Sequence, residues 1–225
     1  MTSPSPRVEA QQRFLAWAAH ELRGEITLQL TLAQATLADP NAHAAALREM
    51  GEQILAACWR QERLLEALLT LARSEHGRLH REAVDLATTA AEVLRAHDHQ
   101  GVASTSALEP ARTAGDAQLV KRLVVNLVAN AVAHNIPGGR LDVVTYTASG
   151  RAVFAISNTG PLIPPGELTH LFQPFQRLGS GASANGVGLG LAIVHAIAKA
   201  HSATITAHAQ PRGGLRVHVA FPALD

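Results

Sequence analysis

Apolar residues recur at three- and four-residue steps in the first third of the chain, which is the spacing of amphipathic helices. This spacing predicts two long helices, over residues 8–38 and 42–76, separated by the proline- and asparagine-containing segment ADPNA. The stripe of the first helix holds Phe14, Trp17, Leu22, Leu28, Leu32 and Ala35. The stripe of the second is heptad-like, as in helical bundles, and holds Leu47, Met50, Ile54, Ala57, Gln61, Leu64, Leu68 and Leu71.

Two helices alone leave such a stripe half covered. Pairing with a second copy of the chain, to give a four-helix bundle, would cover it, so the pattern predicts a homodimer. The alternative is that the hairpin packs against the C-terminal part of its own chain.

The period of the pattern changes after Gly77, where strands begin to alternate with helices. Asp116 is well placed as the N-cap of a helix that extends to Asn135. The predicted strands are a short one within 79–86, a pair at 140–148 and 151–158 joined by Ser-Gly, and a closing pair within 202–210 and 213–222. The other predicted helices are 86–97, a short one within 164–172, and 188–201.

This order predicts an α+β layer in which one mainly antiparallel sheet carries helices on one face. The chain therefore divides into a helical domain, residues 8–76, and an α/β domain, residues 78–225. The formal net charge is +1, which gives no reason to expect nucleic acid or a membrane surface as a partner. The single cysteine, Cys58, excludes a disulfide framework, and no apolar run is long enough to span a bilayer.

Candidate chemistry lies in the second half. Asn126 and Asn130 are four residues apart on one predicted helix, so their amides share a face. An amide oxygen is a suitable ligand for a Mg²⁺ ion that also holds phosphate oxygens. Taken alone, two asparagines are more often ordinary helix-surface residues.

Two glycine-containing segments add to this. GVGLGL, from Gly186 to Leu191, opens an apolar helix whose free N–H groups could bind phosphate, although it lacks the Lys-Ser/Thr of a P-loop. In ISNTG, Asn158 ends a strand and could bond the edge of a nucleobase, with Gly160 leaving room for the ring. Each segment could instead be an ordinary turn. The small, polar stretch 177–185 suits a lid over a nucleotide.

Taken in order, these segments resemble the motifs of the sensor histidine kinases of two-component signalling. FLAWAAHELRGEIT is similar to their H-box and LVVNLVANAVAHN to their N-box. ISNTGPLIPPGEL, LFQPF and GVGLGLAIV resemble the first glycine box, the F-box and the second glycine box. The resemblance extends from about Arg13 to Phe221. It implies a dimeric helical hairpin followed by an ATP-binding α/β sandwich of the Bergerat type, with a mixed, mainly antiparallel sheet.

The resemblance also implies roles for individual residues. His20 would accept the phosphoryl group, and Glu21 would be its adjacent acid or base. Asn130 would bind Mg²⁺, while Phe172 and Phe175 would brace the lid. The residues implied in ATP binding are Asn126, Asn130, His134, Asn158, Gly160, Arg177, Gly186, Gly188, Leu189 and Gly190.

The family's activity would be ATP-dependent autophosphorylation of His20, followed by transfer to an aspartate of a response regulator. Its setting would be the cytoplasm, either alone or as the cytosolic part of a membrane-anchored sensor kinase. One alternative is a dimeric ATP-binding scaffold without turnover, and another is a different Bergerat-type ATPase. A zinc protease of the HExxH type is excluded because Gly24 stands where the second histidine is needed.

Several positions depart from the family pattern. Gly24 and Glu25 replace the polar residue and the proline that commonly follow the histidine, and we therefore expect weak or absent phosphatase activity toward the partner. Asn158 stands in place of the usual aspartate, and Leu162 in place of the second glycine. Ala133 occupies a position that is often basic in the family. The family includes members with NTG in the first glycine box, where this chain has Asn158, so the chain is still expected to bind ATP.

Overall fold

The computed structural model describes residues 23–24, 26–40, 42–75, 80–99, 101–173 and 189–224. The chain divides into two compact units, residues 1–68 and residues 69–225, called here the helical unit and the α/β unit. The boundary predicted near Gly77 lies within residues 76–79, outside the described residues, and stays a prediction. None of the helices in the described ranges has the length and hydropathy that crossing a bilayer requires.

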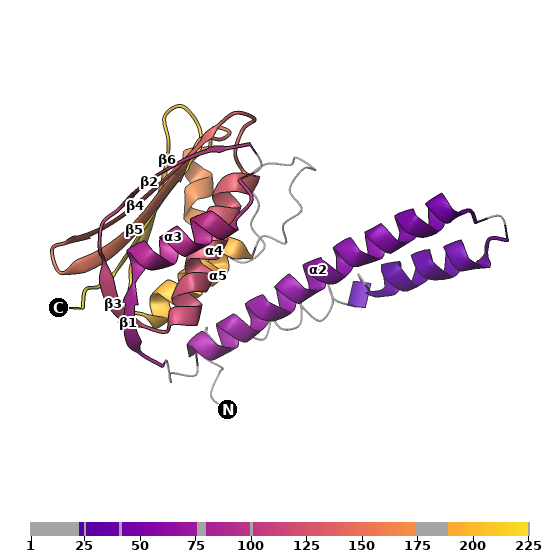
Figure 1. The fold of residues 1–225 in the computed structure, drawn as a ribbon, viewed down its shortest axis with the longest axis horizontal. Coiled ribbons are helices and arrows are strands. Elements are labelled where there is room, and N and C mark those ends of the chain that lie inside the picture. The colour runs from indigo at the N-terminus through magenta and orange to yellow at the C-terminus, as the bar shows by residue number, and fades with distance from the viewer. Residues whose placement is uncertain are drawn as a thin grey trace. The chain divides into compact units, whose positions relative to one another are not determined.

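The helical unit contains the predicted hairpin, as far as the chain is described (Figure 1). Residues 26–38 are helical, and α2 runs from Ala44 to Glu75. Between them the chain turns at Pro40, where the Ala42 N–H donates to the carbonyl of Asp39 at 3.1 Å. The proline and its neighbours therefore end the first helix, as the sequence predicts.

Much of the apolar surface of this unit is exposed in the single chain. Leu28, a member of the predicted stripe, is 68% exposed, and Ala57 is the only hydrophobic residue among the described side chains of this unit that is fully buried. The other large exposed apolar residues are Ile26, Leu30, Leu37, Leu47 and Leu55. The hairpin is present, whereas the dimeric four-helix bundle remains a prediction.

The α/β unit is built on a five-stranded sheet of order β2-β4-β5-β7-β6. Strands β2 and β4 are parallel and the other neighbours are antiparallel, which confirms the mixed, mainly antiparallel sheet. The strands are β2 (Ala103–Leu108), β4 (Arg140–Ala148), β5 (Arg151–Asn158), β6 (Thr204–Ala209) and β7 (Leu215–Pro222). A separate antiparallel pair is formed by β1 (Glu82–Asp85) and β3 (Arg112–Gly115).

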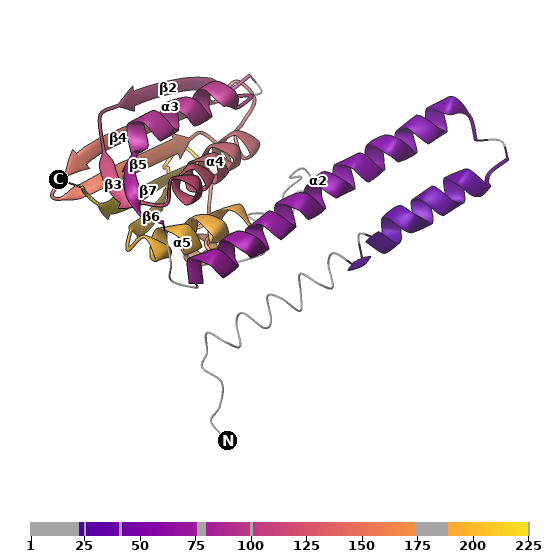
Figure 2. The ribbon, with the colours of Figure 1, turned by 60° about the horizontal axis from the view of Figure 1, so that its bottom comes forward.

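Three helices cover one face of the large sheet: α3 (Leu86–Ala96), α4 (Ala117–Ala133) and α5 (Gly190–Ala200) (Figures 1 and 2). Helix α4 lies between the other two and contacts both. Its apolar residues, among them Leu123 and Leu127, pack toward the sheet, where Phe154 of β5 and Phe221 of β7 are fully buried. This is the single covered face predicted for the α+β layer.

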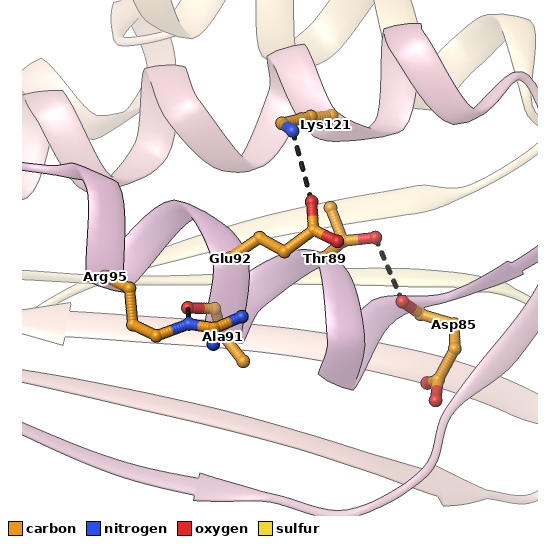
Figure 3. Close-up of polar contacts among 6 residues, drawn as sticks. All are labelled: Asp85, Thr89, Ala91, Glu92, Arg95 and Lys121. Atoms are coloured by element: carbon orange, nitrogen blue, oxygen red, sulfur yellow. Dashed lines mark hydrogen bonds and ion pairs between the residues drawn. The ribbon is translucent and has the colours of Figure 1, made fainter.

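The helix starts agree with the capping residues in the sequence. Asp116 accepts a hydrogen bond from the Leu119 N–H at 3.0 Å and so caps α4, as predicted. Asp85 caps α3 through the Ala87 N–H, and its carboxylate also accepts from the Ala111 N–H, joining two segments of the chain. Figure 3 shows Asp85 beside Thr89, whose hydroxyl donates to the Asp85 carbonyl.

Some elements differ from the prediction. The short helix after the prolines, η1 (Pro165–His170), is a 3-10 helix. Strands β2 and β3 were not predicted, nor were the small sheet and the parallel pairing of β2. The sequence of β2, ASTSAL, has only one large apolar side chain, at its end, and is almost entirely exposed at the sheet edge. An edge strand of small polar residues gives no alternating pattern to detect.

Candidate nucleotide-binding site

The base-binding residues predicted from the sequence lie where β5 ends. Asn158 is the last residue of this strand, and Gly160 follows two residues later. Gly160 packs tightly against the end of α4, because a Cβ there would lie 2.7 Å from the carbonyl oxygen of His134. The N-box helix and the first glycine box are therefore in direct contact, and a side chain at residue 160 would separate them.

Asn158 is oriented by its own backbone. Its side chain, only 5% exposed, donates from Nδ2 to the carbonyl of Thr159 at 2.7 Å. This bond leaves Oδ1 as an acceptor, which is the group needed to bind the exocyclic amino group of adenine. The neutral amide that replaces the family's aspartate therefore keeps the required hydrogen-bonding capacity.

The turn between the two closing strands, β6 and β7, contacts the same strand end, and the sequence did not predict this contact. Gln210 follows β6, and its Nε2 donates to the Asn158 carbonyl at 3.0 Å. Gly213 and Gly214 have φ values of +92° and +97°, and the Gly214 N–H donates to the Pro161 carbonyl at 2.9 Å. The Gly-Gly pair before β7 indicates a turn in the sequence, but it does not indicate that this turn contacts the end of β5.

The phosphate-side motifs also meet. Asn126 on α4 donates from Nδ2 to the Arg122 carbonyl at 2.8 Å. Its Oδ1 lies 3.6 Å from the position of a Cβ on Gly190, the first residue of α5. Among the described residues, no side chain caps the start of α5, and the N–H groups in the first turn of a helix are suited to bind an anion. The N-box and the second glycine box are thus adjacent.

The donor set on α4 suits a magnesium ion shared with phosphates. Asn130 is half-buried one turn after Asn126 and offers a neutral amide oxygen. Among the described residues, no group of three His, Cys, Asp or Glu side chains could form a metal cage. Such a single oxygen ligand fits an ion that takes its remaining ligands from phosphate and water.

Two further predicted site residues, Leu189 and His134, and one departure from the family pattern, Leu162, lie elsewhere around these motifs. Leu189 precedes α5, and its side chain is buried. His134 is exposed at the C-cap of α4, and its N–H bonds back to the Asn130 carbonyl at 3.0 Å. Leu162 is 74% exposed and has no positive φ, so this position does not need the family's glycine.

The F-box residue Phe172 lies close to α5. Its ring centroid is 6.0 Å from that of His195, at an interplanar angle of 32°. Partial burial lowers the pKa of His195 below its usual range, and the nearby Lys199 lowers it further. Phe172 therefore lies beside an imidazole whose environment favours the neutral form, a contact that the sequence did not reveal.

Six predicted residues lie outside the described part of the chain: His20, Glu21, Phe175, Arg177, Gly186 and Gly188. The roles suggested for them remain predictions.

Residues 115–225 match the family described as histidine kinase-, DNA gyrase B-, and HSP90-like ATPase. This range holds α4, α5 and most of the large sheet, including Asn126, Asn130 and Asn158. The α/β unit is thus an ATP-binding domain of this ATPase class.

Relatives identify the family of the chain more narrowly. The sensor protein CutS of Streptomyces coelicolor is 40% identical over 95% of this chain and 53% of its own length. The solved mycobacterial sensor histidine kinase MprB is 30% identical, with a TM-score of 0.59 over 63% of this chain and 98% of that one. The chain belongs to the sensor histidine kinase family.

The chain also shares its fold with a more distant solved structure. Histidine kinase ThkA, solved in complex with response regulator protein TrrA, is 18% identical with a TM-score of 0.69. That match covers 97% of this chain and 63% of ThkA. The chain spans about half the length of the curated relative CutS.

Proposed function

We propose that the chain is an ATP-dependent protein-histidine kinase that phosphorylates its own His20 and passes the phosphoryl group to an aspartate of a response regulator. The observation that carries the proposal is the meeting of three motifs around α4. Asn126 lies beside Gly190, and Gly160 packs on the end of the same helix. Histidine kinases among the relatives support the choice of this ATPase subclass.

In this proposal ATP lies along α4. The Oδ1 of Asn158 accepts from the adenine amino group, and Gly160 leaves space for the ring. The phosphates lie near Asn126 and the start of α5. A magnesium ion held by Asn130 would neutralise phosphate charge, which is the main requirement of phosphoryl transfer.

The proposed reaction follows from the chemistry of imidazole. A histidine near its ordinary pKa is largely neutral at pH 7, so a ring nitrogen of His20 has a free electron pair. That nitrogen would bond to the γ-phosphorus as the bond to the β,γ-bridging oxygen breaks, releasing ADP. Glu21, the next residue, would take or share the proton of the other ring nitrogen.

The proposed partners are a second copy of this chain and a response regulator. A dimer would cover the exposed leucines of the helical unit. A labile phosphohistidine is suited to relay, and ThkA provides an example of a histidine kinase solved with a response regulator.

We further propose that phosphatase activity toward the regulator is weak. Gly24, four residues after His20, has no side chain to orient a water molecule. Its backbone is helical, and a Cβ built there meets nothing within 4 Å. Gly24→Thr should therefore fit and should raise the rate at which a phosphorylated regulator loses its phosphate.

The kinase proposal is tested by incubating the chain with γ-labelled ATP and Mg²⁺. We expect acid-labile label in the wild type and in the control His80→Gln, whose histidine is exposed in the α/β unit. His20→Gln should remain unlabelled. Label that persists in His20→Gln would contradict the assignment of the phosphoacceptor. ATP binding by calorimetry without any label would favour the alternative, a scaffold without turnover.

A further inference from the structure

We propose that Asn135 and Thr159 are positioning residues that hold the adenine side and the phosphate side of the nucleotide site at a fixed separation. Neither residue belongs to the site predicted from the sequence. The inference rests on the proposed function, because it concerns how that same site is assembled.

Asn135 follows the C-terminus of α4, and its amide makes four hydrogen bonds. The Nδ2 group donates to the carbonyls of Ala131, at 3.2 Å, and Arg140, at 3.0 Å. Oδ1 accepts from the N–H of Ile136 at 2.9 Å and from the hydroxyl of Thr159 at 2.6 Å. Two donors and two acceptor sites are the full capacity of an amide, so this side chain has one fixed orientation.

Thr159 completes the connection from the other side. It lies between Asn158 and Gly160, and its hydroxyl accepts from the Arg140 N–H at 2.8 Å while donating to Asn135. The start of β4, the end of β5 and the end of α4 are therefore joined through two side chains. A helix that carries Asn126 and Asn130 is thereby tied to the strand end that carries Asn158.

The backbone around the Asn135–Thr159 hydrogen bond is closely packed. A Cβ on Gly139 would overlap both the Asn135 amide oxygen and the Thr159 hydroxyl. Gly160 is pressed against the His134 carbonyl on the neighbouring side. Close contacts on both sides prevent the strand end from sliding along the helix, so the hydrogen bonds set a distance rather than merely add stability.

This role differs from simple stabilisation in what it predicts for ligands. Adenosine contacts only the Asn158 side, whereas ADP extends from Asn158 to the phosphate side on α4. If Thr159 sets the separation of the two sides, its loss should weaken ADP much more than adenosine. A general loosening of the strand end would weaken both ligands by the same factor.

The experiment measures the dissociation constants of ADP with Mg²⁺ by calorimetry and of adenosine by NMR titration, using the full chain. Thr159→Val keeps the shape and removes the hydroxyl, and we expect ADP to bind about three- to tenfold more weakly. Thr159→Ser keeps the hydroxyl and should bind ADP like the wild type. The matched control is Thr147→Val, whose exposed hydroxyl bonds the Pro110 carbonyl near the other end of β4.

Gly139→Ala provides an independent test, because it separates Asn135 from Thr159 without changing either group. We expect it to weaken ADP at least as much as Thr159→Val does, again with little effect on adenosine. The inference is wrong if both variants bind ADP like the wild type, if Thr159→Ser is as weak as Thr159→Val, or if adenosine weakens equally. Failure of the wild type to bind ADP would overturn the proposed function, and this inference with it.

Discussion

The helical unit and the α/β unit differ in where their apolar side chains lie, although the sequence pattern predicted elements in both. In the helical unit Leu28 belongs to a regular stripe and is still 68% exposed. In the α/β unit Phe154 lies on β5, where every residue after Arg151 is buried, and is itself 0% exposed. Periodicity therefore predicts which residues share a face, but burial requires a second surface, and a hairpin of two helices does not supply one.

The largest expected effect is on the stability of the α/β unit, which buries its apolar core within a single chain. Phe154→Ala should lower the free energy of unfolding of this unit by about 3–5 kcal/mol, because it leaves a cavity between sheet and helices. Urea titration followed by far-UV circular dichroism measures the loss. Both tryptophans, Trp17 and Trp59, belong to the helical unit, so their fluorescence is a separate probe. We expect the fluorescence transition to move less, and coincident shifts would show that the two units unfold together.

The second largest effect is expected at the proposed homodimer contact of the helical unit. Leu28→Lys should raise the dissociation constant of the homodimer about tenfold or more, since it places a charge on the surface to be covered. Sedimentation over a range of concentrations measures this constant. Leu162→Lys is the matched control, because that leucine is equally exposed but lies in the α/β unit. A dimer unaffected by Leu28→Lys would mean that the stripe serves another contact.

A pH dependence is expected from the α/β unit, where His201 is 1% exposed. Its Nδ1 is 2.8 Å from the Ile197 carbonyl, and its Nε2 accepts from the Asp116 N–H at 3.0 Å. Burial lowers the pKa of His201, and Arg81 adds to this, whereas the Ile197 carbonyl and Asp116 oppose it. The folded state thus favours the neutral ring.

The sign of the effect follows from the lowered pKa. Below about pH 6.5, the ordinary pKa of histidine, the unfolded chain binds the proton more readily, so the free energy of unfolding should fall as the pH falls. Above that pH, neutral His201 makes its full contribution to the free energy of unfolding. His201→Gln can keep one donor and one acceptor without titrating, and should make the dependence flatter in urea titrations at pH 7.5 and 5.5. An unchanged slope would assign the dependence to other groups.

The smallest effect is expected at the surface of the α/β unit. Lys121 on α4 and Glu92 on α3 form an exposed ion pair at 3.1 Å (Figure 3). Glu92→Gln should change the free energy of unfolding by less than about 1 kcal/mol, because water screens such pairs. Urea titration at low and high salt measures it. A larger loss would mean that contacts between α3 and α4 at the surface matter as much as the buried core.

The candidate site was predicted from the sequence only in part. Asn126, Asn130 and Asn158 could be selected because amides at helix spacing and at a strand end suit phosphate, magnesium and a base. Asn135 and Thr159 could not, because their role depends on two positions 24 residues apart in the chain returning to hydrogen-bond distance. The contact of Gln210 with Asn158 spans 52 residues and has no local signal.

Local residue preferences account for most of the elements, since helix and strand periods, Asp116 at an N-cap and the prolines at the start of η1 all act within a few residues. The sequence also determined the order of the motifs, and hence the family. The parallel pairing of β2 with β4, the packing of Gly160 on His134 and the hydrogen bond between Asn135 and Thr159 become visible only in the folded chain. These contacts join segments distant in the chain, and their geometry depends on the whole packed sheet and its helices rather than on local residue preferences.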